Sequence, residues 1–142
     1  MSVVLEAQGL SKTFANGVRA VHEVNLLVQA GETLGIVGES GCGKSTTAKM
    51  LLRLLDADSG TVVFDGADVT RARGRKLRDL RRRLQVVPQN PQTSLNPRLR
   101  IADSLDFTMR AQGIGRAQRA RSIPQLLDRV GLDPSFAARY PH

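Results

Sequence analysis

The sequence predicts an α/β fold with an additional antiparallel β-subdomain, and two observations carry this prediction. First, segments 3–8 and 18–29 contain loosely alternating apolar residues and flank the strong turn signal Asn16-Gly17. Second, the short apolar segment 33–37 leads into a glycine-rich loop, and segment 44–55 after the loop has helical periodicity. Two strands joined by a tight turn are typical of an antiparallel sheet, whereas strand–loop–helix is typical of an α/β core.

The glycine-rich loop fits the pattern G-x-x-x-x-G-K-[ST] of a phosphate-binding loop, with the residues Gly38-Glu39-Ser40-Gly41-Cys42-Gly43-Lys44-Ser45. The helix expected after it has one apolar face, made by Ala48, Leu51, Leu52 and Leu55. Glycines let the backbone approach a phosphate closely, and the amides at the start of the helix point toward the anion. Lys44 is expected to reach the β- and γ-phosphates, and the Ser45 hydroxyl to ligate Mg²⁺.

The rest of the chain predicts further strands and helices in alternation. We expect a strand at 61–64 with a hairpin turn at Asp65-Gly66, followed by an arginine-rich helix with Leu77, Leu80 and Leu84 on its apolar side. A strand at 84–87 and a loop around Gln89-Asn90-Pro91 and Asn96-Pro97 come next. The chain then predicts a helix at 100–112 and helical sequence at 116–130. Pro124 interrupts the last segment, so Ser122 is expected to cap a new helix there.

Asp65 has a second interpretation. Proteins with a phosphate-binding loop hold Mg²⁺ partly through an acid at the end of an apolar strand, and Asp65 follows such a strand. However, Gly66 comes directly after it, and an Asp-Gly pair is typical of a hairpin turn. No other apolar strand after residue 45 ends in an acid, so the sequence predicts that the hydrolytic half of the site is absent from this chain.

Composition excludes several classes of protein. The chain has 142 residues with a 41% hydrophobic fraction, which suits one ordinary folded domain. No apolar run approaches the ~18 residues that span a membrane, and the start does not have the pattern of a signal peptide. Cys42 is the single cysteine, which rules out an internal disulfide and suits a reducing compartment.

The net charge of +8 is concentrated in residues 71–83, which hold eight basic residues and the single acid Asp79. Such a stretch can bind nucleic acid or anionic lipid. It contains no aromatic residue that could stack on a base, and its leucines have helical spacing. We therefore favour a solvated helix face or a surface for a partner protein over nucleic acid.

Two further runs of residues make the chain resemble the ATP-binding subunit of an ABC transporter. They are Leu10-Ser11-Lys12-Thr13-Phe14 and the series from Gly31 to Thr46. The run Pro88-Gln89-Asn90-Pro91-Gln92-Thr93-Ser94-Leu95-Asn96-Pro97-Arg98 is similar to the Q-loop of importers for dipeptides, oligopeptides and nickel. Arg139-Tyr140-Pro141-His142 resembles the residues just before the family's signature motif.

The resemblance implies roles for individual residues. Phe14 matches the aromatic residue that stacks on adenine, and Val21 is expected to pack on the same ring; the alternative for Phe14 is a core position. Gln89 matches the glutamine that contacts Mg²⁺ or the attacking water and couples the site to the permease, so Lys44 and Gln89 are the expected catalytic residues. The expected ligands of ATP are Phe14, Gly38, Ser40, Gly41, Cys42, Gly43, Lys44, Ser45 and Thr46, with Cys42 contributing only its backbone amide.

The resemblance also implies an architecture and partners. Residues 1–90 correspond to the ATP-binding core with its antiparallel β-subdomain, and residues 91–142 to the Q-loop and an incomplete helical subdomain. In this family two ATPase subunits pair head to tail on the cytoplasmic face of the plasma membrane and drive a transmembrane permease, to which a substrate-binding protein delivers cargo. The signature motif, the catalytic Glu and the switch His would follow His142. We expect weak nucleotide binding and negligible hydrolysis from this chain alone.

Two alternatives to the importer remain. One is a soluble ABC-type ATPase that acts on nucleic acid through the arginine-rich helix. The other is a non-hydrolysing remnant that binds only nucleotide or a partner. The run from Ser94 to Arg98 favours the importer.

Overall fold

The computed structural model describes residues 2–90 and 94–142, so Pro91, Gln92 and Thr93 of the Q-loop-like run lie outside the described residues. The chain divides into two compact units, Met1–Leu84 and Gln85–His142. The first unit contains an antiparallel sheet and two α-helices. The described part of the second contains two α-helices and a short 3₁₀ helix. The fold is α/β, as the sequence predicts.

The sheet of the first unit has four strands in the order β2-β1-β3-β4, and every neighbouring pair is antiparallel. Its strands are β1 (Val3–Thr13), β2 (Arg19–Gln29), β3 (Ser59–Phe64) and β4 (Ala67–Asp68). The Asn16-Gly17 turn forms where the sequence predicts it, with the Phe14 amide donating to the Val18 carbonyl at 2.9 Å. The first strand is longer than predicted and continues to Thr13.

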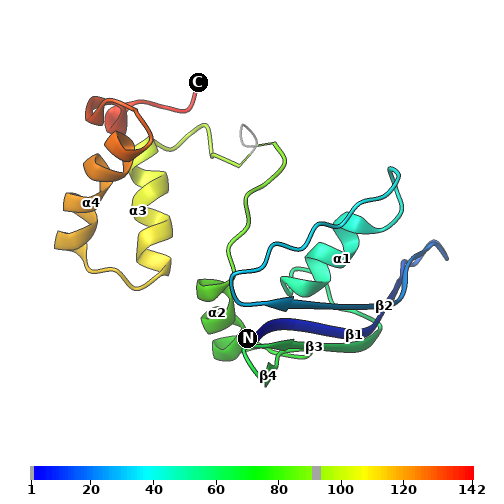
Figure 1. Cartoon of the computed structure of the whole chain (residues 1–142). Coiled ribbons are helices and arrows are strands. Elements are labelled where there is room, and N and C mark those ends of the chain that lie inside the picture. Colours follow the sequence, from blue (N-terminus) through cyan, green and yellow to red (C-terminus); the bar gives the residue numbers. More distant parts are fainter. Residues whose placement is uncertain (1, 91–93) are drawn as a thin grey trace. The chain divides into compact units, whose positions relative to one another are not determined.

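Helix α1 (Lys44–Leu51) lies against one face of this sheet (Figure 1) and helix α2 (Gly74–Arg83) follows β4 in the chain. Leu10, Met50 and Val62 are the largest fully buried side chains, each stabilising the fold by roughly 2 kcal/mol. Among the described residues, the hydrophobic core of this unit consists of Ala7, Leu10, Val21, Met50, Leu51, Val62, Phe64, Val69, Ala72 and Leu80. Leu77 and Leu84 pack against it, so the predicted apolar side of the arginine-rich helix is confirmed.

Helix α1 is shorter than the predicted segment 44–55. It ends at Leu51, because Arg53 adopts a left-handed conformation with φ of 54°. The side chain of Arg53 is buried and forms an ion pair with Asp56 at 2.8 Å, which holds the turn after the helix. Of the predicted apolar face, Leu51 is buried in the core and Leu55, beyond the end of the helix, packs against it, but Met50 fills the core in place of Ala48 and Leu52.

The predicted strands at 33–37 and 84–87 do not form. Val37 and Val87 are each 92% exposed, although an interior parallel strand would bury such residues on both faces. A strand needs a neighbour to accept and donate its backbone hydrogen bonds. Within the described residues, the sheet contains only the four antiparallel strands, and neither segment pairs with it.

The Asp65-Gly66 hairpin is confirmed. The two residues have φ of 50° and 74°, and they join β3 to β4 with Phe64 opposite Ala67. The Asp65 carboxylate receives a hydrogen bond from Arg83 at 2.6 Å. Asp65 therefore lies in a surface turn and in an ion pair, which does not suit a magnesium ligand.

The second unit contains α3 (Ile101–Ala111), α4 (Arg116–Arg129) and the 3₁₀ helix η2 (Pro134–Ala138), which pack on one another. The predicted break at Ser122 is wrong, because α4 continues through Pro124. Ile123 and Leu127 are buried one turn apart, and their burial offsets the hydrogen bond that proline cannot make. No described helix has the length and apolar character needed to cross a membrane.

Candidate functional site

The loop Gly38–Ser45 connects the extended segment after β2 to the first turn of α1. Residues 38–42 are exposed, and Gly43 is the N-cap of the helix. The loop is therefore neither flat nor buried in the sheet. Its exposed residues directly precede the start of a helix, an arrangement that phosphate binding requires.

Gly43 contacts strand β2 too closely to be any other residue. Its φ is 94°, and a β-carbon placed on it would lie 2.2 Å from the Ala20 carbonyl oxygen. The same β-carbon would lie 3.3 Å from Cγ2 of Val21, which is buried. The glycine of the motif thus serves two purposes, since it permits the left-handed turn and lets the loop pack directly on the sheet.

The ammonium of Lys44 turns back over the loop. It donates to the Gly38 carbonyl oxygen at 2.7 Å and to the carbonyl oxygen of Glu39, while Cys42 Sγ lies 3.6 Å away. A lysine ammonium has three donors, and a thiol is a weak acceptor. A phosphate oxygen placed beside Lys44 would therefore replace the Cys42 contact and leave the two carbonyl bonds intact.

The first turn of α1 supplies amides as well as charge. Thr47 donates to the Gly43 carbonyl oxygen at 2.8 Å, which closes the first helical turn. The amides of Lys44, Ser45 and Thr46 precede that bond and have no acceptor within the helix. No side chain caps the helix, and its first turn contains no acid, so its positive end is open to an anion.

Ser45 is the candidate ligand of a divalent cation. It is exposed in the first turn of α1. Among the described residues, no group of three or more His, Cys, Asp or Glu could hold a metal ion. Mg²⁺ is commonly bound mainly by phosphate oxygens and water, so a single protein hydroxyl can serve as its ligand.

Phe14 lies directly after β1, in the turn that leads into β2. Its side chain is 40% exposed, which argues against the core alternative. Val21 is buried in β2, beside Gly43 of the loop, and its packing on the ring of Phe14 stays a prediction. The exposed ring of Phe14 therefore follows strand β1, and the backbone of the neighbouring strand β2 contacts the loop Gly38–Ser45.

Gln89 belongs to the second unit, where it is exposed and lies outside the helices. The loop Gly38–Ser45 belongs to the first unit. The contact of Gln89 with Mg²⁺ or water therefore stays a prediction from the sequence. The remaining expected ligands, from Gly38 to Thr46, are brought together by one continuous loop and helix.

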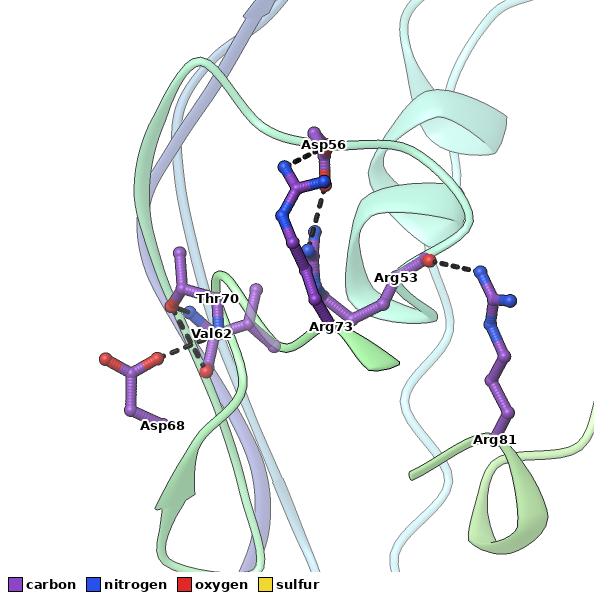
Figure 2. A network of polar contacts seen from close by, with 7 residues as sticks. All are labelled: Arg53, Asp56, Val62, Asp68, Thr70, Arg73 and Arg81. Carbon is purple, nitrogen blue, oxygen red and sulfur yellow. Dashed lines mark hydrogen bonds and ion pairs between the residues drawn. The ribbon is translucent and has the colours of Figure 1, made fainter. Parts of the chain in front are cut away.

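A polar network on the first unit was not expected from the sequence (Figure 2). Asp56 accepts from the buried Arg53 at 2.8 Å and lies 3.7 Å from Arg73, while Arg81 donates to the Arg53 carbonyl oxygen at 3.0 Å. The hydrogen bond from Arg53, with help from the charge of Arg73, holds the pKa of Asp56 below its usual value. The spacing of Arg53 and Asp56 is a signal that could have indicated this pair.

Comparison with known proteins gives a consistent result. A family model described as ABC transporter matches residues 21–141. A probable peptide ABC transporter ATP-binding protein of Sinorhizobium fredii is 47% identical over 134 residues, which are 94% of this chain and 38% of that protein. An oligopeptide transport ATP-binding protein of Bacillus subtilis is 39% identical over 98% of this chain and 48% of that protein.

A glutathione import ATP-binding protein of Pectobacterium atrosepticum is 42% identical over 94% of this chain and 22% of that protein. The chain thus spans less than half the length of each of these three relatives. A solved ATP-binding subunit of an ABC transporter is 25% identical with a TM-score of 0.78, covering 97% of this chain and 54% of that one. A dimeric ATP-binding cassette bound to ADP and phosphate has a TM-score of 0.80 at 24% identity, covering 96% and 61% of the two chains, and supports the fold.

Proposed function

Because this chain belongs to the ABC transporter family, we propose that it is part of an ATP-binding subunit that powers an importer, with peptides as the cargo. One observation carries the nucleotide part of this proposal: Lys44 holds its own loop closed through Gly38 and Glu39 at the open start of α1. The peptide part rests on the relatives, whose names describe peptide, oligopeptide and glutathione transport.

The residues of the loop fit a nucleotide phosphate tail. Lys44 would contact the β- and γ-phosphates, and the amides from Gly41 to Thr46 would surround them. The exposed Ser45 hydroxyl would hold Mg²⁺, which neutralises charge on the phosphate oxygens when it is bound. The exposed ring of Phe14 would stack on adenine, a contact worth about 1–3 kcal/mol for bases.

The proposed partners follow from the family. Two such subunits would pair head to tail at the cytoplasmic face of the membrane, so that each nucleotide lies between this loop and a motif from the other subunit. Gln89 would sense the nucleotide and transmit closure to a transmembrane permease, which a substrate-binding protein supplies with peptide. We propose that the 142-residue chain by itself hydrolyses ATP negligibly. Asp65 is the acid that follows an apolar strand and could have held Mg²⁺ for hydrolysis, but it is in an ion pair with Arg83.

Titration of the chain with a fluorescent ATP analogue and Mg²⁺ tests the nucleotide site. Lys44→Ala should weaken binding by about tenfold or more, because hydrogen bonds to charged groups are worth roughly 1.5–3 kcal/mol. Lys49→Ala is the matched control, since Lys49 is an exposed lysine on the same helix and loses the same charge. Equal weakening by the two variants would contradict the proposed site.

Phosphate release from ATP, measured on the same samples, tests the second part of the proposal. We expect a rate no greater than that of buffer. Turnover that disappears in Lys44→Ala would contradict negligible hydrolysis while supporting the nucleotide site. Phe14→Ala should weaken binding of the ATP analogue but leave binding of inorganic triphosphate unaffected, because triphosphate has no base to stack.

A further inference from the structure

A hollow on the first unit lies outside the loop Gly38–Ser45. It comprises two adjoining cavities of about 410 and 420 Å³, which share Gly60, Thr70, Arg71 and Arg73 in their lining. The walls come from the turn after α1, the start of β3 and the segment that connects β4 to α2. Figure 2 shows part of this wall, with Arg53, Asp56, Thr70 and Arg73 drawn as sticks.

The wall is held in shape by close contacts. A β-carbon on Gly60 would lie 2.5 Å from the carbonyl carbon and oxygen of Gly9 on β1, so only glycine fits there. The Thr70 hydroxyl accepts from the Val62 amide at 2.8 Å, which fixes the segment before α2 to β3. The hollow is therefore bounded by backbone that is packed and hydrogen-bonded to the neighbouring strands.

Two of the three carboxylates of this hollow are paired with cations. Asp56 pairs with Arg53 and Arg73, and Asp58 pairs with Lys12 at 2.6 Å. Asp68 accepts from the Thr70 amide at 2.8 Å. Asp56 and Asp58 are thus neutralised by their ion pairs, whereas Asp68 is bonded only to Thr70 and keeps its negative charge, which interacts with that of Lys76.

Two cations in the lining remain without a close partner. Arg71 and Lys76 form no hydrogen bond or ion pair within the part of the chain that the structure describes, and Lys76 acts on Asp68 only through its charge. Arg53 also lines the hollow, with 4% of its side chain exposed and its Nε lacking a partner among the described residues. The positive charge in the wall therefore exceeds what the protein itself satisfies.

The start of α2 adds to this charge. Arg73 is the N-cap of the helix but makes no side-chain capping bond, and the first turn contains no acid. The amides of Gly74, Arg75 and Lys76 therefore have neither a helical acceptor nor a cap. They lie at the positive end of a ten-residue helix, beside the hollow that Arg73 and Lys76 line.

From these observations we propose that this hollow binds a phosphate-bearing anion, with Arg71, Lys76 and the first amides of α2 as its ligands. Arginine and lysine donate charge-assisted hydrogen bonds to phosphate. The start of a helix supplies further backbone amide donors, which have a partial positive charge. The anion can be a small soluble phosphate compound or the headgroup of an anionic lipid. This site is separate from the nucleotide loop and does not depend on the function proposed for that loop.

The test uses inorganic pyrophosphate as the probe and the amide signals of the ¹⁵N-labelled full chain as the readout. Signals of Gly60, Gly74 and Lys76 report on the hollow, while those of Gly41 and Lys44 report separately on the nucleotide loop. We expect saturable shifts at the hollow. Arg71→Ser combined with Lys76→Ser should weaken binding there about tenfold, since each variant removes a charge-assisted hydrogen bond.

The matched control combines Arg78→Ser and Arg129→Ser, which removes the same charge from exposed residues that do not line the hollow. It should weaken binding less than about twofold. Circular dichroism verifies that both variants fold. Equal weakening by the two pairs, or shifts that increase linearly without saturation, would mean general counter-ion attraction and would overturn the proposal.

Sedimentation with vesicles distinguishes the two sources of the anion. Phosphatidylcholine vesicles with and without phosphatidylglycerol are compared for the unchanged chain and for both variant pairs. Binding that requires phosphatidylglycerol and is lost only in the Arg71/Lys76 pair supports a lipid headgroup. Saturable pyrophosphate binding without vesicle binding supports a soluble phosphate compound. The absence of both overturns the proposal.

Discussion

The Ala20 carbonyl oxygen on β2 lies 2.2 Å from the position that a β-carbon would occupy on Gly43. The antiparallel sheet and the phosphate-binding loop are therefore in direct backbone contact. Besides its place in the phosphate-binding motif, this one glycine sets how closely the helix start approaches the sheet. Stability and nucleotide binding are thus expected to depend on the same residue.

Gly43→Ala should destabilise the first unit, because the new methyl group meets backbone and φ of 94° is strained for alanine. We expect a loss of about 2–4 kcal/mol in the free energy of unfolding, measured by urea titration. Gly35→Ala is the control, since a β-carbon at that position would have nothing within 4 Å and Gly35 has no positive φ. A Gly43→Ala variant as stable as the Gly35→Ala variant would contradict the close contact.

The carboxylate of Asp58 is expected to contribute to stability in a pH-dependent way. The hydrogen bond from Lys12, and that from the Thr13 amide at 2.7 Å, hold the pKa of Asp58 below its usual value. A carboxyl group with a lowered folded pKa stabilises the protein above its unfolded pKa of about 3.9, and this contribution disappears as the pH falls through the folded pKa.

Asp58→Asn should therefore be less stable than the unchanged chain at about pH 7 and should match it at about pH 2. Urea unfolding at a series of pH values measures the difference. Glu23→Gln, at an exposed residue without an ion pair among the described residues, should differ little at either pH. A constant gap between Asp58→Asn and the unchanged chain at every pH would rule out the carboxylate as its source.

Arg83 fastens the end of α2 to the β3–β4 hairpin in two ways. Its guanidinium pairs with Asp65 at 2.6 Å and lies 4.8 Å from the centroid of the Phe64 ring. Arg83→Ala should lower the free energy of unfolding by about 1 kcal/mol, because it loses an exposed ion pair and a cation–π contact. Asp65→Asn, which loses only the ion pair, should cost less, and an equal cost would exclude a contribution from Phe64.

Replacement of Pro124 by alanine is expected to stabilise the second unit. Within α4 it cannot donate a backbone hydrogen bond, and a proline inside a helix costs roughly 3 kcal/mol relative to alanine. Pro124→Ala should raise the melting temperature of the second unit, whereas Gln125→Ala at the next exposed residue should change it little. A lower melting temperature for Pro124→Ala would indicate that the packing of Ile123 and Leu127 requires the proline.

Much of the first unit could be predicted from local signals. The Asn16-Gly17 and Asp65-Gly66 turns form hairpins, and Leu77, Leu80 and Leu84 face the core. The apolar segments 33–37 and 84–87 show where such reasoning fails, since apolar composition indicates burial but does not supply a neighbouring strand. Pro124 shows the converse, because packing overrides an unfavourable local preference.

The sequence by itself determined the motif Gly38–Ser45, the residue types of the phosphate site and the family resemblance, because these depend on residue order along one continuous segment. Only the tertiary structure decided that Ala20 meets Gly43, that Arg53 is buried beside Asp56, and that Arg71 and Lys76 line a common hollow with the start of α2. These relationships join residues on different elements. Their distances are set by how the sheet and helices pack, which no local pattern of residues specifies.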